Sequence, residues 1–190
     1  MLQLPESVFI VKLLTHDLAP DLYYHTIDHT LDVYNSVQKI GLQEKCNATD
    51  LKLIPIAALY HDCGYIDGKH NHESRSCEIA VQVLPGFGYS QSDVDIICSL
   101  IMVTKLPQEP NSLMEQIICD ADLDYLGRAD FFTIGNRLYR EMLAYGHINN
   151  EDEWYQLQIE FLKNHRYFTA TANITRNAKK QEHLNILLAK

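Results

Sequence analysis

The apolar residues of this chain recur at helical spacing along nearly its whole length. In residues 28–40, for example, an apolar or aromatic residue occupies every third position, at Leu31, Tyr34, Val37 and Ile40. Residues three or four apart lie on one face of a helix. No segment shows the regular alternation of apolar and polar residues that predicts a strand of useful length. The pattern therefore predicts an all-α fold.

Capping residues, glycines and prolines divide this pattern into helices of ordinary length. Helices are predicted over 5–18, 26–40, 47–62, 72–84, 90–105, 112–126, 128–145, 151–162 and 169–188. Gly41 is expected to end the second helix. Gly64 is expected to end the third in a left-handed conformation, which glycine adopts without a steric penalty. We expect eight or nine helices around one core, with residues 1–190 forming a single domain.

Composition and charge argue against several classes of function. The 190 residues carry a formal net charge of −9, so no general basic surface favours a nucleic-acid polymer. No apolar stretch reaches the roughly 18–20 residues needed to cross a membrane. The five cysteines are scattered and form no Cys-x-x-Cys pair, which argues against a disulfide framework. A cytoplasmic protein with no membrane or nucleic-acid partner is expected.

Histidines and acidic residues supply the candidate chemistry. Five of the nine histidines lie between residues 25 and 72: His25, His29, His61, His70 and His72. The acidic residues that accompany them are Asp62, Glu73, Asp120 and Asp122. Imidazole nitrogens combined with carboxylate oxygens suit zinc, iron, manganese or nickel. The remaining histidines are expected on the surface: His16, His147, His165 and His183.

The adjacent pair His61-Asp62 is the centre of the candidate site. It ends an apolar run, and the open end of a helix allows two neighbouring side chains to lean toward one point. A metal site completed by His29 and Asp122 would join three predicted helices and leave positions open for water and substrate. Asp120 is an alternative acidic residue, because acids two apart on a helix point in different directions.

Three motifs, taken in order, resemble the signature of the HD superfamily of metal-dependent phosphohydrolases. They are Tyr24-His25-x-x-x-His29, Leu59-Tyr60-His61-Asp62 and Asp120-Ala121-Asp122-Leu123. The similarity is to the small stand-alone predicted HD phosphohydrolases. It covers a motif-bearing core of about residues 20–130, which the C-terminal helices in 131–190 would complete. The resemblance implies an HD-like helical fold.

The resemblance also implies a metal cofactor and a reaction. The implied ligands are His29, His61, Asp62 and Asp122. Asp122 is preferred to Asp120, because the last aspartate of the signature usually follows an alanine and precedes a leucine-type residue. The ion would be Mn, Ni, Co, Mg, Zn or Fe. The implied activity is hydrolysis of a nucleotide or other small phosphoester by a metal-activated water, as a phosphomonoesterase or phosphodiesterase. Asp62 would orient the water, and His72 or His25 would protonate the leaving oxygen.

Other polar residues could bind the substrate or assist the reaction. The basic candidates for phosphate binding are Lys69, Arg75, Lys105 and Arg128. Glu73 has two interpretations. It could act beside His72, in catalysis or as a ligand of a second ion, or it could only complement the dipole of a first helical turn.

Two further functions remain open at this point. The first is a non-catalytic signalling module that binds a nucleotide and a metal without turnover, which the retention of all four ligand positions argues against. The second is a di-iron oxygenase of the same superfamily. The absence of histidine from residues 93–105 argues against this oxygenase. A homo-oligomer is possible in each case.

Overall fold

The computed structural model describes residues 2–68 and 70–190. Within these ranges the chain forms nine α-helices and three short 3-10 helices, and no strand. The α-helices are α1 (Pro5–Asp17), α2 (Ile27–Gln43), α3 (Asp50–Tyr60), α4 (His72–Val83), α5 (Gln91–Met102), α6 (Leu113–Asp122), α7 (Phe131–Ala144), α8 (Glu151–Asn164) and α9 (Ala170–Leu188). The 3-10 helices are η1 (Cys63–Asp67), η2 (Leu84–Phe87) and η3 (Asp124–Gly127). The predicted all-α fold is confirmed.

Helix α3 is the central element of the first half of the chain. Every residue from Leu53 to Tyr60 is buried, as expected for a helix that is apolar around its whole circumference. It packs against α2 on one side and α5 on another, and α6 contacts both α2 and α3. The residues that follow α3 therefore begin in the middle of the fold, at the point where three helices meet.

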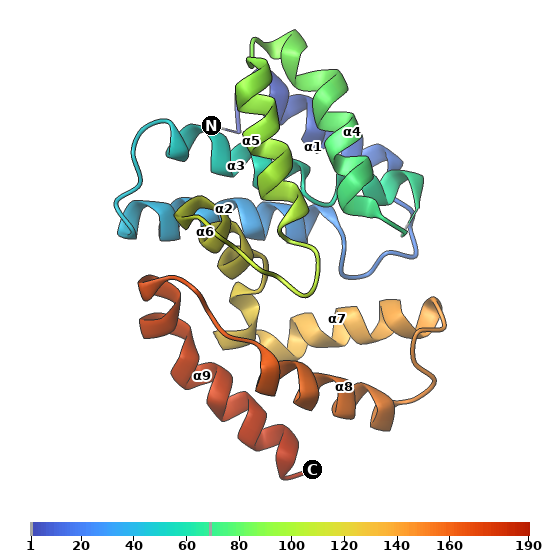
Figure 1. The fold of residues 1–190 in the computed structure, drawn as a ribbon. Coiled ribbons are helices and arrows are strands. Elements are labelled where there is room, and N and C mark those ends of the chain that lie inside the picture. Colours follow the sequence, from blue (N-terminus) through green and yellow to red (C-terminus); the bar gives the residue numbers. More distant parts are fainter. Residues whose placement is uncertain (1, 69) are drawn as a thin grey trace.

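The last three α-helices form a second layer. Figure 1 shows α7, α8 and α9 together on the side of the molecule away from α1, α4 and α5. A second apolar cluster holds this layer together, and Tyr24, from the segment before α2, belongs to it. The short helix η3 links α6 to α7 and packs against α9. Gly127 permits this contact, because a Cβ there would lie 2.5 Å from the carbonyl oxygen of Arg176.

The two predicted glycine stops are wrong. Helix α2 continues through Gly41 to Gln43, and a Cβ at Gly41 would lie 3.1 Å from Leu51 Cδ2. Helix α3 ends at Tyr60, and Gly64 lies within η1 without a positive φ. A Cβ at Gly64 would lie 2.1 Å from the carbonyl oxygen of His72. Both glycines therefore serve close packing and not a left-handed turn.

None of the helices in the described part of the chain is long and apolar enough to span a membrane.

Candidate active site

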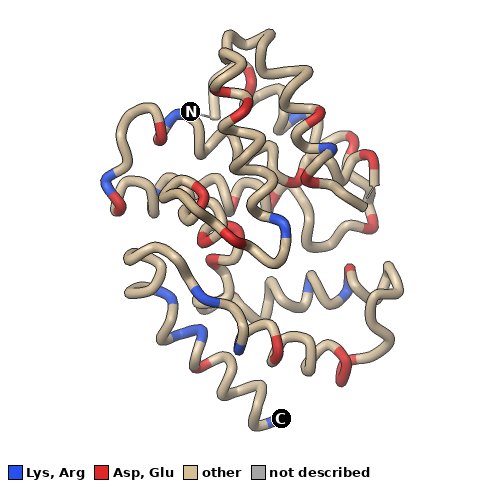
Figure 2. The backbone as a smooth tube through the Cα atoms, viewed as in Figure 1, with Lys and Arg blue, Asp and Glu red and all other residues tan. Residues whose placement is uncertain are grey.

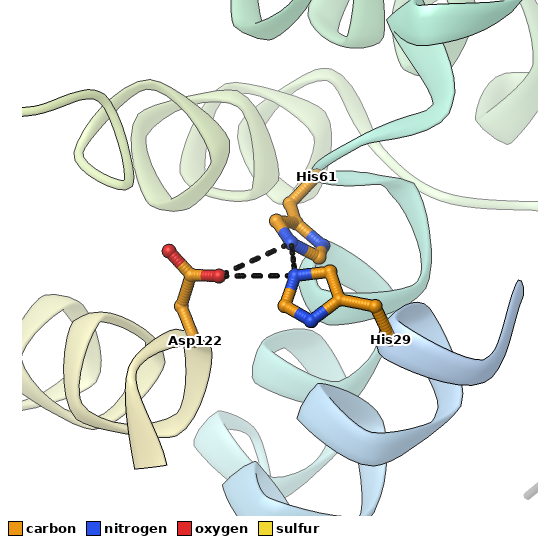
Figure 3. Close-up of side chains that lie close together, drawn as sticks. All are labelled: His29, His61 and Asp122. Atoms are coloured by element: carbon orange, nitrogen blue, oxygen red, sulfur yellow. Dashed lines mark hydrogen bonds and ion pairs between the residues drawn. The ribbon is translucent and has the colours of Figure 1, made fainter. Parts of the chain in front are cut away.

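Three residues from separate helices point toward one centre (Figure 3). His29 lies in the first turn of α2, His61 directly follows α3, and Asp122 is the last residue of α6. The Nε2 atoms of the two histidines are 3.4 Å apart. Asp122 Oδ1 lies 3.3 Å from His29 Nε2 and 3.5 Å from His61 Nε2. These atoms can all reach one cation.

Asp62 adds a fourth converging group. Its Oδ2 atom lies 3.4 Å from His29 Nε2 and 3.2 Å from His61 Nε2. His61 retains helical backbone angles, whereas Asp62 has φ −107° and ψ 6°. The change in backbone direction after His61 allows two consecutive side chains to face the same point. The sequence motif is thus brought together as a cluster of two imidazoles and two carboxylates.

A hydrogen bond fixes the orientation of the His61 ring. His61 Nδ1 lies 2.8 Å from the carbonyl oxygen of Ala58, one turn earlier in α3. A carbonyl oxygen can only accept, so Nδ1 carries the proton and donates it. Nε2 therefore faces the cluster, and in the neutral ring it presents a lone pair there, which is the usual arrangement of a histidine that binds a metal.

Burial and mutual charge give the four groups unusual electrostatics. Burial by itself would lower the pKa of His29, but the neighbouring carboxylates of Asp122 and Asp62 raise that pKa to about 9. Burial would likewise raise the pKa of Asp122, yet contact with His29 and His61 lowers it to about 2. The two imidazoles therefore stabilise the ionised carboxylate of Asp122.

The donor set fits a divalent cation. Asp62 Oδ2 is buried and accepts no hydrogen bond, although it lies beside two imidazoles. A buried carboxylate oxygen without a partner is costly unless a cation compensates it. Two imidazole nitrogens and two carboxylate oxygens are ligands that zinc, iron, manganese and nickel accept. The residues present therefore suit the metal that the sequence motifs imply.

His72 and Glu73 lie on the other side of Asp62. They begin α4, after Asn71 in a left-handed conformation. His72 Nε2 is 3.4 Å from Asp62 Oδ1 and 3.5 Å from Glu73 Oε1. Asp62 therefore faces His29 and His61 with one oxygen and His72 with the other.

His25 is held by a residue far away in the sequence. Glu141 of α7 is buried, and its Oε2 accepts hydrogen bonds from the backbone N–H groups of Tyr24, at 2.7 Å, and His25, at 3.1 Å. Its Oε1 accepts from His25 Nδ1. Burial raises the pKa of Glu141, but the hydrogen bonds from His25 and the backbone outweigh it and leave the pKa below the usual range.

The other nitrogen of the His25 ring meets Tyr65. Its Nε2 lies 3.1 Å from the Tyr65 hydroxyl. The Tyr65 ring also stacks against both His25 and His72, with each pair of ring centroids 4.2 Å apart. Tyr65 therefore connects the two histidines for which the sequence predicted a proton-transfer role.

The sequence interpretation missed Glu141 and Tyr65. A signal for Glu141 does exist in the chain. It continues the apolar stripe of Phe131, Ile134 and Leu138 on α7, where a solvent-facing acid is not expected. A carboxylate on an apolar stripe indicates a buried partner.

Asp120 and Asp122 have different surroundings. Asp120 is fully buried and faces the start of α9. Its carboxylate accepts hydrogen bonds from Phe168 N at 2.8 Å, from Thr169 N at 2.7 Å and from Thr169 Oγ1 at 2.7 Å. Asp120 thus anchors the last helix, while Asp122 faces the histidines.

A cavity of about 600 Å³ opens from this cluster toward the second layer. Asp62, His72, Glu73 and Asp122 line one end. His25, Tyr65 and Glu141 line its wall. Residues of η3, α7 and α8 line the other end, including Leu126, Phe131, Leu138, Trp154, Phe161 and Leu162. The cavity has the size of typical small-molecule sites.

The predicted phosphate binders are dispersed. Lys105 is exposed and lines the cavity, as does His70. Arg75 donates a hydrogen bond to the carbonyl oxygen of Asp67 and is not among the lining residues. Lys69 lies outside the described residues.

Arg128 is occupied by carboxylates away from the cavity lining. Its Nη1 lies 2.8 Å from Asp32 Oδ1, and its Nη2 lies 2.6 Å from Asp130 Oδ2. The role of Arg128 as a substrate ligand therefore gains no support from its position.

Comparisons with known proteins are consistent with this geometry. The family profile described as HD domain matches residues 26–124. A predicted HD superfamily hydrolase from an uncultured Thermotogales bacterium is 24% identical, with a TM-score of 0.66 over 100% of this chain and 95% of its own. Bacillus subtilis YpgQ, solved in complex with ADP, is 19% identical, with a TM-score of 0.63 over 97% of this chain and 96% of its own. No curated protein sequence matches. At these identities the two structures show a shared fold.

Proposed function

This chain belongs to the HD domain family, and on that premise we propose that it is a metal-dependent phosphohydrolase acting on a nucleotide or another small phosphoester. The observation that supports this most directly is the convergence of His29, His61, Asp62 and Asp122 within a buried cluster at one end of a cavity. We further propose that residues 1–190 act as one unit, because both layers line that cavity.

The four converging residues would hold the ion, which could be Mn, Ni, Co, Mg, Zn or Fe. A divalent ion in such a site lowers the pKa of water toward neutrality and neutralises charge on phosphoryl oxygens. His61 presents Nε2 because its Nδ1 is bonded to Ala58. Asp62 lies beside both imidazoles and would orient the attacking water, since a carboxylate can accept its proton.

Side chains along the cavity wall would protonate or bind the oxygens of the substrate. His25 and His72 both line the cavity, and either could donate a proton to that oxygen. The carboxylate of Glu141 favours the proton on His25 Nδ1, which leaves Nε2 directed to Tyr65. Glu73, whose Oε1 lies 3.5 Å from His72 Nε2, would orient that imidazole. Lys105, at the cavity edge, would bind phosphoryl oxygens.

The proposal of a nucleotide substrate is supported by the similarity of this fold to that of YpgQ. The structure of YpgQ holds ADP and shares this fold over nearly the whole chain. A nucleotide is therefore a reasonable first candidate for the cavity, and phosphomonoesters and phosphodiesters without a nucleobase belong in the same screen.

The test is a panel of phosphoesters assayed with Mn²⁺, Ni²⁺, Co²⁺ or Mg²⁺, before and after treatment with a chelator. We expect hydrolysis that chelation abolishes and added metal restores. The Asp62→Asn variant should lose about 100-fold or more in kcat, whereas Asp95→Asn, on the exposed face of α5, should match the unmodified protein. Turnover that survives both the chelator and Asp62→Asn would refute the proposal.

A binding module without turnover is the alternative that the same experiment addresses. Isothermal titration with ADP and Mg²⁺ would be run beside the hydrolysis assay. Tight binding of ADP with no product from any phosphoester would favour the module over the enzyme.

A further inference from the structure

The part of the cavity that η3, α7 and α8 line is far more apolar than phosphate chemistry requires. We propose that the substrate carries a single phosphoryl group on a large, mainly apolar organic group, which lies between η3, α7 and α8. This inference rests on the phosphohydrolase proposal and narrows its substrate class. We call this end of the cavity the apolar chamber, defined by Leu126, Phe131, Leu138, Trp154, Phe161 and Leu162.

The apolar chamber is a preformed part of the fold. Phe131 is 1% exposed, Leu162 is 3% exposed and Trp154 is 6% exposed, so their positions are fixed by packing. Phe131 and Leu162 belong to the second apolar cluster, and Leu138 and Phe161 lie against it. An apolar group that entered the chamber would gain the free energy of leaving water without first having to order these side chains.

The chamber is continuous with the metal cluster. One cavity is lined both by Asp62 and Asp122 and by Trp154 and Leu162. A phosphoryl group at the cluster would fill only a small part of the roughly 600 Å³ that this cavity encloses. The remaining volume can take the rest of a larger substrate.

The charges along the cavity do not suit a polyphosphate chain. Among its described lining residues, four are carboxylates: Asp62, Glu73, Asp122 and Glu141. Lys105 is the one lysine or arginine in that described lining. Each further phosphoryl group adds negative charge that needs cationic donors. A bound divalent ion can compensate the charge at the cluster, but a second or third phosphate farther along the wall would meet the carboxylate of Glu141.

Arg128, which follows η3, and Arg176 of α9 are paired with carboxylates. Arg128 pairs with Asp32 and Asp130. Arg176 donates to Asp124, with Nε 2.7 Å from Oδ1. The basic residues of the second layer that Figure 2 shows in blue therefore do not add cations to the described wall of the cavity.

Trp154 makes the proposal measurable without turnover. It is the one tryptophan of the chain, so its fluorescence reports on the chamber directly. We would titrate the full chain in Mg²⁺ with methyl-, butyl- and octylphosphonate, which cannot be hydrolysed, and with pyrophosphate and ADP. Each added methylene that enters the chamber should tighten binding by about threefold to fourfold.

A matched pair of variants locates the effect. Leu138→Asn places a polar group in the chamber wall and should flatten the dependence on chain length. Leu42→Asn, at an exposed position of α2, should leave that dependence unchanged. In hydrolysis assays, octyl phosphate should have a higher kcat/KM than methyl phosphate, ADP or ATP.

Binding that is independent of chain length, or tighter for pyrophosphate and ADP than for octylphosphonate, would overturn the inference. Preferential hydrolysis of ADP or ATP would also overturn it, and would leave the phosphohydrolase proposal standing. The absence of hydrolysis for every phosphoester would instead refute the phosphohydrolase proposal, together with the inference that rests on it.

Discussion

The buried carboxylate of Glu141 accepts two hydrogen bonds from His25 and one from Tyr24, from a helix that begins more than a hundred residues later in the chain. It accepts the backbone N–H of His25 and of its neighbour Tyr24, and it also accepts from His25 Nδ1. This arrangement fixes both the position of the imidazole and the nitrogen that carries its proton. The second layer of helices therefore orients a side chain that lines the same cavity as Asp62 and Asp122.

Replacing Glu141 should impair proton donation more than substrate binding. We expect Glu141→Gln to lower kcat by about 10–100-fold and to change KM little, because an amide has one acceptor oxygen and cannot accept from both His25 Nδ1 and the backbone N–H groups. The defect should be larger for an alkyl phosphate than for p-nitrophenyl phosphate, whose leaving group needs no proton.

The readout is kcat for both substrates, compared with Glu78→Gln at an exposed position of α4. A purely structural role for Glu141 would lower both rates equally, and that result would contradict the assignment.

Substitutions should show that Asp120 has a structural role and that Asp122 binds the metal. Saturating metal should raise the Tm of the unmodified protein by roughly 5–10 °C, because an ion at about 100 times its Kd stabilises the folded state by about 2.7 kcal/mol. Asp122→Asn should lose most of that shift. Asp120→Asn should keep the shift but start from a lower Tm, since it disturbs the three hydrogen bonds to residues 168 and 169.

Differential scanning calorimetry with and without Mn²⁺ measures the Tm shift of each variant. Equal loss of the metal-induced shift in both variants would show that Asp120 also binds the ion.

Much of the fold follows from local patterns that the sequence displays. Ser90 and Ser112 cap α5 and α6 with reciprocal side-chain bonds to Asp93 and Glu115, as their spacing predicts. His72 opens α4 as expected. These features depend on residues three or four apart, so no tertiary information is needed to find them.

The wrong predictions share one physical cause. In each case the environment of the residue is set by a contact outside its own helical turn. His183 was expected on the surface, yet it is 3% exposed, stacks on Phe131 and lies 3.0 Å from the carbonyl oxygen of Leu126. Gly64 was expected to be left-handed, but its small size accommodates the backbone of His72. Neither contact can be inferred from neighbouring positions.

In the candidate site too, the residues within motifs could be predicted from the sequence, whereas a long-range contact could not. The order of the motifs pointed to His29, His61, Asp62 and Asp122, and the structure brings the side chains of these four residues together. The Glu141 contact spans two layers, and no local motif marks it. Only the position of Glu141 on an apolar stripe gave a signal.

Gly64 should tolerate no larger residue. A Cβ there would lie 2.1 Å from the His72 carbonyl oxygen and 2.9 Å from Arg75 Cβ. Gly64→Ala must therefore push α4 away from η1, and we expect it to lower the free energy of unfolding by roughly 3 kcal/mol or more. Urea denaturation followed by circular dichroism measures this change.

Gly86→Ala is the matched control. No atom lies within 4 Å of a Cβ at Gly86, so its effect should stay within about 1 kcal/mol. Because η1 and α4 carry Tyr65 and His72, any folded Gly64→Ala protein should also lose activity. Full stability and activity in Gly64→Ala would show that η1 and α4 can separate freely.

His165 should make the protein less stable in mild acid. Burial, together with the charge of Lys180, lowers the pKa of His165 to about 3. Its Nδ1 lies 3.2 Å from Lys180 Nζ, so the folded protein resists protonation there. The unfolded chain binds a proton near pH 6.5, whereas the folded chain does not until about pH 3. The stability that His165 contributes is therefore present above about pH 6.5 and is lost as the pH falls toward 3.

This linkage predicts a loss of roughly 2 kcal/mol between pH 7.5 and pH 5.0 from His165 alone, given 1.36 kcal/mol for each pKa unit of difference. Urea denaturation at the two pH values measures it. In His165→Gln the loss should be smaller by about that amount, since glutamine does not titrate. His16→Gln, at an exposed position of α1, should retain the full pH dependence of the unmodified protein. If His165→Gln and His16→Gln lose equal stability in acid, His165 is protonated in the folded state and the assigned pKa is wrong.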